Sequence, residues 1–215
     1  ELKQLHGVES HVEPLDLSKP GIANELKSRL DAAGIVVSLL VNNAGYGLYG
    51  EFLDQPVDRT LNMLQLDVLT LTELSHVFAA DMVRRGGGQI LLIASVGAYQ
   101  VTPTYAAYCA AKAYVLSLGE ALHEELKPEG VTVTALSPGV TRTGFFNAAG
   151  QTPNSFQRAA MMESRPVAEI GLNALRKGRA SIIPGVMNAL TTFFITRLVL
   201  RFLQPKMAHA VMKQS

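Results

Sequence analysis

Helical and strand-like stretches alternate along this chain. Apolar residues recur with a helical period in residues 22–33, 56–85, 106–127 and 166–177, and glycine or proline closes the first three. Short runs that favour strands, most of them almost continuously apolar, occupy residues 12–16, 35–41, 89–94, 131–136 and 180–183. The β-branched run 35–41 is typical of a parallel strand buried on both faces. The length of stretch 56–85 predicts a helix with a bend.

This alternation predicts an α/β fold, a single doubly wound, Rossmann-like domain with a parallel sheet and helices on both faces. Its 215 residues suffice for one well-buried domain and are too few for two comfortable ones. In such folds ligands bind beyond the carboxyl ends of the strands. Candidate chemistry is therefore expected just after Leu15, Val41, Ala94 and Leu136.

Composition narrows the function only a little. Hydrophobic residues make up 48% and charged residues 17%, which is typical of a globular core, and a net charge of +1 without a basic stripe argues against a nucleic-acid partner. The five histidines are scattered without metal-ligand spacing, so we expect no metal site. Cys109 is the single cysteine and favours a reducing compartment such as the cytoplasm. We interpret it as a small buried residue rather than a redox-sensitive thiol.

Three glycines after a predicted strand imitate a phosphate-binding turn. Gly45, Gly47 and Gly50 have the spacing of the dinucleotide fingerprint. In that fingerprint the third glycine lies in the first turn of a helix. Here five residues separate Gly50 from Pro56, which is the first residue able to open a helix. We therefore reject these glycines as a phosphate loop.

Four polar motifs follow the predicted strands in order. They are Asn42-Asn43-Ala44-Gly45, Ser95, Tyr108-Cys109-Ala110-Ala111-Lys112 and Pro138-Gly139-Val140-Thr141-Arg142-Thr143. Together, and over most of the chain, they resemble the short-chain dehydrogenase/reductase family. The resemblance implies an oxidoreductase that uses NAD or NADP to interconvert a carbonyl and an alcohol.

The spacing of Tyr108 and Lys112 has a chemical reason. Four residues apart on a helix, both side chains project from one face. An ordinary tyrosine has a pKa of about 10, and a nearby ammonium is expected to lower the pKa of Tyr108 so that it can exchange a proton with a carbonyl or alcohol. Ser95 lies at the end of a buried strand, where its hydroxyl can bond the substrate oxygen or cap a turn.

The resemblance also assigns residues to the cofactor. Tyr108 and Lys112 would hold the nicotinamide ribose, and Thr143 would bond the carboxamide. Asp16 would contact the adenine ring, although an ordinary helix cap explains it nearly as well. The whole cofactor set is Asp16, Asn42, Ala44, Gly45, Tyr108, Lys112, Pro138, Gly139, Thr141 and Thr143.

Two features depart from the family pattern. Asp67 stands where many members carry an asparagine that holds a water in the proton relay; an aspartate can bind that water, but it adds a charge beside Lys112. The family's first strand, its Gly-x-x-x-Gly-x-Gly turn and the following helix and strand do not precede Glu1. We interpret the chain as an N-terminally incomplete piece of a longer protein, because a sheet without its first strand would expose a large apolar surface.

Two segments bear on substrate and partners. Residues 141–164 contain Phe145, Phe146, Phe156, Met161 and Met162, which predicts a mobile loop over an apolar substrate or a loop packed on its own domain. Residues 187–215 predict a C-terminal helical segment that is apolar as far as 203.

Arg197 and Arg201 argue against a membrane span in that segment. We expect it to cover the pocket, to form an oligomer contact or to touch a membrane surface. The resemblance implies a homodimer or homotetramer formed through two long helices.

The leading hypothesis is an NAD(P)H-dependent oxidoreductase acting on a small apolar carbonyl or alcohol, with Ser95, Tyr108, Lys112 and Asp67 as its catalytic set. NADP is weakly preferred over NAD. Two alternatives stay open. One is a non-catalytic binding or regulatory module, motivated by Asp67 and the missing glycine turn. The other is a membrane-associated lipid or steroid reductase, motivated by the apolar C-terminal segment.

Overall fold

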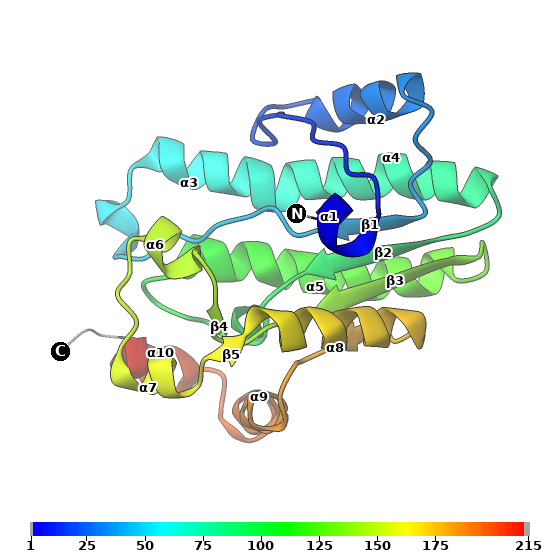
Figure 1. The fold of residues 1–215 in the computed structure, drawn as a ribbon. Coiled ribbons are helices and arrows are strands. Elements are labelled where there is room, and N and C mark those ends of the chain that lie inside the picture. Colours follow the sequence, from blue (N-terminus) through cyan, green and yellow to red (C-terminus); the bar gives the residue numbers. More distant parts are fainter. Residues whose placement is uncertain (1, 213–215) are drawn as a thin grey trace.

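A computed structural model describes residues 2–212, except for the side chains of Leu2, Phe156 and residues 210–212. The expectation for Phe156 therefore lies outside the described residues. The centre of the molecule is a sheet of four parallel strands (Figure 1). Its order is β1 (Leu39–Asn42), β2 (Gly88–Ile93), β3 (Val131–Leu136) and β6 (Ser181–Ile182). The predicted doubly wound α/β fold is confirmed.

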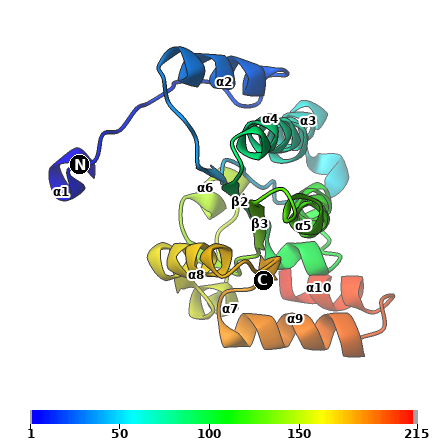
Figure 2. The same ribbon diagram turned by 90° about the vertical axis from the view of Figure 1, so that its right-hand side faces the viewer.

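Helices flank this sheet on both faces (Figure 2). On one side lie α2 (Ile22–Ala32), α4 (Leu71–Arg84) and α5 (Ala106–Leu126), and on the other lies α8 (Ser164–Arg176). The remaining helical elements are α1 (Leu2–His6), η1 (Phe52–Asp54), α3 (Val57–Leu64), η2 (Gln65–Thr70), η3 (Val96–Tyr99), α6 (Phe145–Ala149), α7 (Ser155–Ala159), α9 (Val186–Leu198) and α10 (Gln204–Met212). The stretch 57–84 is continuously helical, with a π-helical turn, η2, between α3 and α4.

Alternate strand residues build two cores. Ile90 and Val133 point to the side of α4 and α5, where they belong to one cluster with Phe78 and Val115. Leu91 lies in a separate cluster beneath α8. This alternation follows from the pleat of a strand, whose successive side chains leave on opposite faces. The two cores hold the carboxyl ends of β2 and β3 in register.

Two strand predictions are wrong. Residues 12–16 form no strand. Leu15 N donates to the nearby carbonyl of Glu13, and no ladder pairs the segment with a described strand. The run 35–41 is not buried on both faces, because α8 packs over β2 and β3 while Val36, Leu39 and Val41 stay exposed. The actual strand, β1, is shorter and begins at Leu39.

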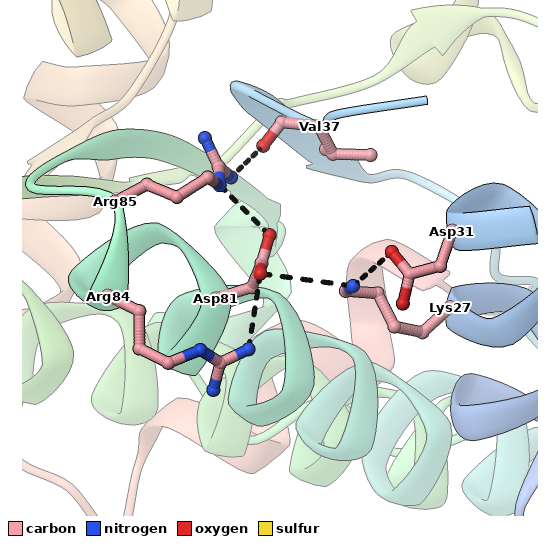
Figure 3. Close-up of polar contacts among 6 residues, drawn as sticks. All are labelled: Lys27, Asp31, Val37, Asp81, Arg84 and Arg85. Carbon is pink, nitrogen blue, oxygen red and sulfur yellow. Dashed lines mark hydrogen bonds and ion pairs between the residues drawn. The ribbon is translucent and has the colours of Figure 1, made fainter. Parts of the chain in front are cut away.

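A polar cluster fastens the ends of α2 and α4 at the amino edge of the sheet (Figure 3). Asp81 accepts from Arg85 Nε at 3.0 Å and pairs with Arg84 at 3.1 Å and with Lys27 of α2 at 3.9 Å. Arg85 also donates to the carbonyl of Val37, just before β1, at 2.7 Å. The cluster joins three elements at the edge opposite the strand ends where chemistry is expected.

The segment 141–164 is folded against the domain rather than open. It contains α6, α7 and a small parallel ladder between β4 (Thr141–Arg142) and β5 (Met162–Glu163). Phe145 packs with Tyr105 and Tyr108, whereas Met162 packs with Leu136 beneath α8. The segment is therefore packed on its own domain, and its movement over a substrate stays a prediction.

Candidate active site

A cavity of about 680 Å³ opens beyond the carboxyl ends of β1, β2 and β3. Ser95 follows β2 directly, and Pro138 follows β3 by two residues. Helix α5 brings Tyr108 and Lys112 to the same cavity from the side. The strand ends thus bring together the polar motifs that the sequence places far apart, as expected for this fold.

Ser95, Tyr108 and Lys112 converge in this cavity. The Ser95 side chain hydrogen-bonds that of Tyr108 and also accepts from the backbone N–H of Gly97 at 3.0 Å. Lys112 Nζ lies 5.7 Å from the centre of the Tyr108 ring and donates to the carbonyl of Ile93 at 3.2 Å. The one-turn spacing on α5 therefore places both side chains beside the end of β2.

Asp67 reaches this group from the π-helical turn η2. Its carboxylate is fully buried and forms an ion pair with Lys112, with Oδ2 3.0 Å from Nζ. Its Oδ1 accepts from the backbone N–H of Tyr46 at 3.2 Å. A Cβ added to Gly45 would lie 2.8 Å from the same Oδ1. Glycine at this position therefore lets the turn after β1 pack on the carboxylate.

Burial governs the acid–base properties of the site. It raises the pKa of Asp67, and the neighbouring Lys112 ammonium opposes this shift. Burial also raises the pKa of Tyr108, the Ser95 hydrogen bond lowers it, and the Asp67 charge raises it further. The lowering expected from Lys112 is thus not what the structure shows, because desolvation dominates and the ammonium is already paired with Asp67. Tyr108 stays protonated at neutral pH.

Part of the predicted cofactor set lines the same cavity. The members that do so are Gly45, Tyr108, Lys112, Pro138, Gly139, Thr141 and Thr143. The Thr141 hydroxyl donates to the carbonyl of Gly139 at 3.0 Å. Thr143 Oγ1 instead accepts from the backbone N–H of Phe145 at 3.2 Å, which leaves its O–H able to donate to a ligand.

Three members of the predicted set lie elsewhere. Asn42 is buried and donates to Ser75 Oγ at 3.0 Å, so its side chain fastens β1 to α4. Ala44, like Asn42, lines a neighbouring cavity of about 140 Å³. Asp16 is exposed, and its Oδ1 accepts from the backbone and hydroxyl of Ser18 at 3.0 and 2.7 Å. These bonds lower the Asp16 pKa and match the alternative of a local turn cap.

The sequence interpretation missed polar residues of the loop side. Tyr105 and Gln151 line the cavity, and their side chains are hydrogen-bonded to each other. The exposed Asn43 lines the cavity as well. Asn43 belongs to the motif Asn42-Asn43-Ala44-Gly45 that follows β1. Gln151 carried no signal, because a single amide in an irregular segment has neither periodicity nor a partner at fixed spacing.

Comparisons with known proteins place the chain in a family. The sequence model described as short chain dehydrogenase matches residues 1–154, and the chain belongs to this family. It is 32% identical to the probable oxidoreductase EphD of Mycobacterium tuberculosis over 137 residues, which are 63% of this chain and 23% of EphD. The chain thus spans about a quarter of that relative.

Two further similarities extend over more of the chain. It is 26% identical to the human very-long-chain 3-oxoacyl-CoA reductase over 224 residues, covering 99% of this chain and 69% of the human protein. Among solved structures, a short-chain dehydrogenase from Sphingobium yanoikuyae in complex with NADPH superimposes with a TM-score of 0.76 at 29% identity. That match covers 88% of this chain and 75% of the other.

Proposed function

We propose that the protein is an oxidoreductase that interconverts a carbonyl and an alcohol with NADPH or NADH. The observation that carries this proposal is the convergence of Ser95, Tyr108 and Lys112 on one cavity at the strand ends. The NADPH complex of the similar Sphingobium protein supports the cofactor class, and we keep NADP as the weakly preferred form.

The residues of this chain fit the nicotinamide end of such a cofactor. Glycine backbone at Gly45 and Gly139, together with the Thr143 hydroxyl, borders the space in front of Tyr108. A bound nicotinamide would supply the hydride. Lys112 would serve as the cation beside the ribose, and its pairing with Asp67 fixes the position of its ammonium.

In this reaction the side chains of the protein would supply the proton. In the direction of reduction, the Tyr108 hydroxyl gives its proton to the carbonyl oxygen as that oxygen gains negative charge. The Ser95 hydroxyl donates a hydrogen bond to the same oxygen. Because burial raises the Tyr108 pKa, the acid form is available throughout the neutral range, which favours reduction.

Two measurements on the purified protein test the proposal. Titration with NADPH and NADH, followed by nicotinamide fluorescence, should show saturable binding. With an apolar ketone as substrate, Tyr108→Phe should lower the rate of reduction about 10²- to 10⁴-fold, since it removes the proton donor. The control, Tyr114→Phe, removes a hydroxyl on the same helix that bonds Thr72 at 2.9 Å outside the cavity, and it should change the rate little. If neither nucleotide binds, even to a version of the protein that carries the family's Gly-x-x-x-Gly-x-Gly turn before Glu1, a non-catalytic module becomes the better account.

A second candidate is a reductase that works at a membrane surface on long apolar substrates. The observation that supports this candidate is the exposure of helix α9, in which no described side chain is buried. Its exposed apolar residues are Val186, Met187, Leu190, Phe193, Phe194 and Leu198. Residues 170–215 contain seven Lys or Arg and no Asp or Glu, which suits an anionic surface. Within the described residues, none of the helices is both long and apolar enough to cross a bilayer. Contact would therefore be peripheral.

We also propose a homodimer or homotetramer and a cytoplasmic setting. Leu61, Leu69 and Tyr114 are exposed on the side formed by α3, η2 and α5, where helices of two copies could pack. The buried thiol of Cys109 supports a reducing compartment. Light scattering on a sizing column measures the oligomeric state. A protein that remains monomeric at high concentration contradicts the proposed homodimer or homotetramer.

A further inference from the structure

The loop side of the cavity contains a buried amide whose hydrogen-bonding capacity is only half used. Gln151 lines the cavity and is 5% exposed. Its Oε1 accepts from the Tyr105 hydroxyl at 2.6 Å, whereas its Nε2 has no hydrogen-bond partner among the described residues. Buried amide N–H donors without a partner are uncommon in folded proteins. This N–H group is therefore a candidate to donate a hydrogen bond to a bound ligand.

The orientation of this amide is fixed by its surroundings. Gln151 follows Gly150, which has φ 74° and closes α6, and its backbone N–H donates to the carbonyl of Phe146 at 3.0 Å. The Tyr105 hydroxyl donates to Gln151 Oε1 at 2.6 Å. The amide nitrogen is therefore the side-chain atom of Gln151 that is left without a partner.

The backbone just before Tyr105 has an unusual conformation. Thr104, the residue before it, has φ 68°, the only positive φ of a non-glycine residue in the described chain. The carbonyl of Thr104 accepts from Gly50 N at 3.0 Å, and Tyr105 N donates to Thr102 at 3.2 Å. A β-branched residue adopts this conformation at an energetic cost, and such strain is found where a neighbouring side chain must be aimed.

Another amide on this side of the cavity, Gln157, is engaged by the backbone. Gln157 Oε1 accepts from Asn154 N at 2.9 Å. The Thr102 hydroxyl lies beside the Cys109 thiol and, like Gln151 Nε2, is buried without a hydrogen-bond partner among the described residues. Gln151 thus offers the cavity a directed donor, one ring away from the proposed proton donor, since the rings of Tyr105 and Tyr108 lie 5.7 Å apart.

We propose that Gln151 Nε2 donates a hydrogen bond to a second oxygen of the substrate, distinct from the oxygen that reacts at Tyr108. This inference rests on the proposed function and names its substrate class: an uncharged, mainly apolar ketone or alcohol that carries one further carbonyl, ether or hydroxyl oxygen. The substrate is uncharged because Lys112 is the one charged residue among the described residues of the cavity wall, and it is paired with Asp67.

A series of shape-matched ketones tests this assignment. Undecan-2-one is compared with analogues in which an ether oxygen replaces one methylene at successive positions along the chain. The wild-type protein should reduce at least one analogue with a kcat/KM about tenfold or more above that of undecan-2-one, because a site with a buried donor discriminates against a substrate that leaves it unpaired.

Gln151→Leu should abolish this preference, so that the ether analogues and undecan-2-one are reduced with similar kcat/KM. A second variant, Tyr105→Phe, frees the amide to rotate and should weaken the preference without removing the donor. Thermal melting of both variants verifies that they fold. If Gln151→Leu does not fold, Gln151→Met provides the same comparison with a flexible side chain.

The outcomes separate this inference from the proposed function. Reduction of every analogue with equal efficiency, or a preference that survives in Gln151→Leu, overturns the role of Gln151 and leaves the oxidoreductase intact. Failure of the wild-type protein to reduce any member, together with a failure to bind NADPH, overturns the proposed function and this inference with it.

Discussion

At the residue scale, the pairing of Lys112 with the carboxylate of Asp67 weakens the effect of its ammonium on the pKa of Tyr108. An ammonium alone would favour the phenolate, but here Nζ lies 3.0 Å from a fully buried carboxylate. Taking such a pair out of water costs free energy that its mutual attraction must offset. Burial is the largest cause of the raised pKa of Tyr108, and the Asp67 charge raises it further.

Replacing Asp67 by asparagine should therefore shift the pH dependence of alcohol oxidation. Oxidation needs the Tyr108 phenolate, so its rate rises with pH as the phenol ionises. Removing the Asp67 charge takes away one cause of the raised pKa and leaves Lys112 to favour the phenolate. The rising limb should move to lower pH, with oxidation at pH 8 roughly three- to tenfold faster.

The measurement is a pH–rate profile of alcohol oxidation for both proteins. The other groups facing the phenol, Ser95, Tyr105 and Cys109, are unchanged in the variant. Asp58→Asn makes the same charge change at an exposed position of α3 and should leave the profile where it is. If the rising limb of the Asp67→Asn profile lies at the same pH as that of the wild-type protein, the Asp67 carboxylate does not raise the pKa of Tyr108.

The packing of Gly45 on Asp67 gives a second residue-scale prediction. In Gly45→Ala the new Cβ would lie 2.8 Å from Oδ1, so the carboxylate or the turn must move. We expect a loss of about 1–3 kcal/mol in the free energy of unfolding, as for other overpacked sites, together with a fall in kcat. Gly144→Ala is the matched control, since its Cβ would meet nothing within 4 Å. Denaturant unfolding measures both, and equal stability of the two variants would contradict the tight packing.

At the element scale, much of the arrangement could be predicted from the sequence. The helix that contains Tyr108 and the strand that ends before Ser95 are recognisable from local periodicity, and their meeting follows from the fold class. Burial of the run 35–41 could not be predicted in this way, because it depends on which helix covers β1. Likewise, Gln151 acquires its role only from contact with Tyr105, 46 residues earlier in the chain.

The polar cluster at the ends of α2 and α4 yields an element-scale prediction (Figure 3). Burial opposes ionisation of Asp81, but its bond to Arg85 and the charges of Lys27 and Arg84 together lower its pKa. A folded-state pKa below the unfolded value gives stability that is present above the unfolded pKa and is lost as pH falls through the folded pKa. Asp81→Asn should therefore cost about 1 kcal/mol or less at pH 7.

That cost corresponds to a Tm lower by about 2–4 °C at pH 7 for a domain of this size. The difference should shrink toward zero below the folded-state pKa, where Asp81 is neutral in the wild-type protein as well. Asp31→Asn serves as the control, because Asp31 pairs with Lys27 within α2 and its side chain is 57% exposed. Calorimetry at both pH values measures the two variants. A deficit in Asp81→Asn that persists undiminished in acid would contradict the ionic account.

At the scale of the whole molecule, charge and apolar surface are divided unevenly along the chain. All 18 acidic residues lie at or before Glu169, while the C-terminal residues 170–215 are basic. This segment includes the end of α8 and the helices α9 and α10, and the last two lie together at one side of the molecule in Figure 2. Exposed phenylalanines and arginines on one element are typical of helices that lie in a membrane interface.

We therefore predict that the protein sediments with vesicles of phosphatidylcholine and phosphatidylserine, and much less with phosphatidylcholine alone. Each basic residue near an anionic surface contributes about 1 kcal/mol, so Arg197→Glu/Arg201→Glu should weaken the partition at least about tenfold. Phe193→Ser/Phe194→Ser should weaken it as well, by removing the apolar contact. Lys19→Glu/Lys127→Glu reverses two exposed charges outside α9 and should not.

Salt distinguishes the two contributions, because it screens the arginine attraction and leaves apolar insertion in place. The phenylalanine variant should therefore lose its remaining binding at high salt, whereas the arginine variant should respond little. If the wild-type protein stays in the supernatant with anionic vesicles, the exposed face of α9 does not serve a membrane. A sizing column would then show whether the Phe193→Ser/Phe194→Ser change dissociates an oligomer, which would assign the face to a second copy of the chain.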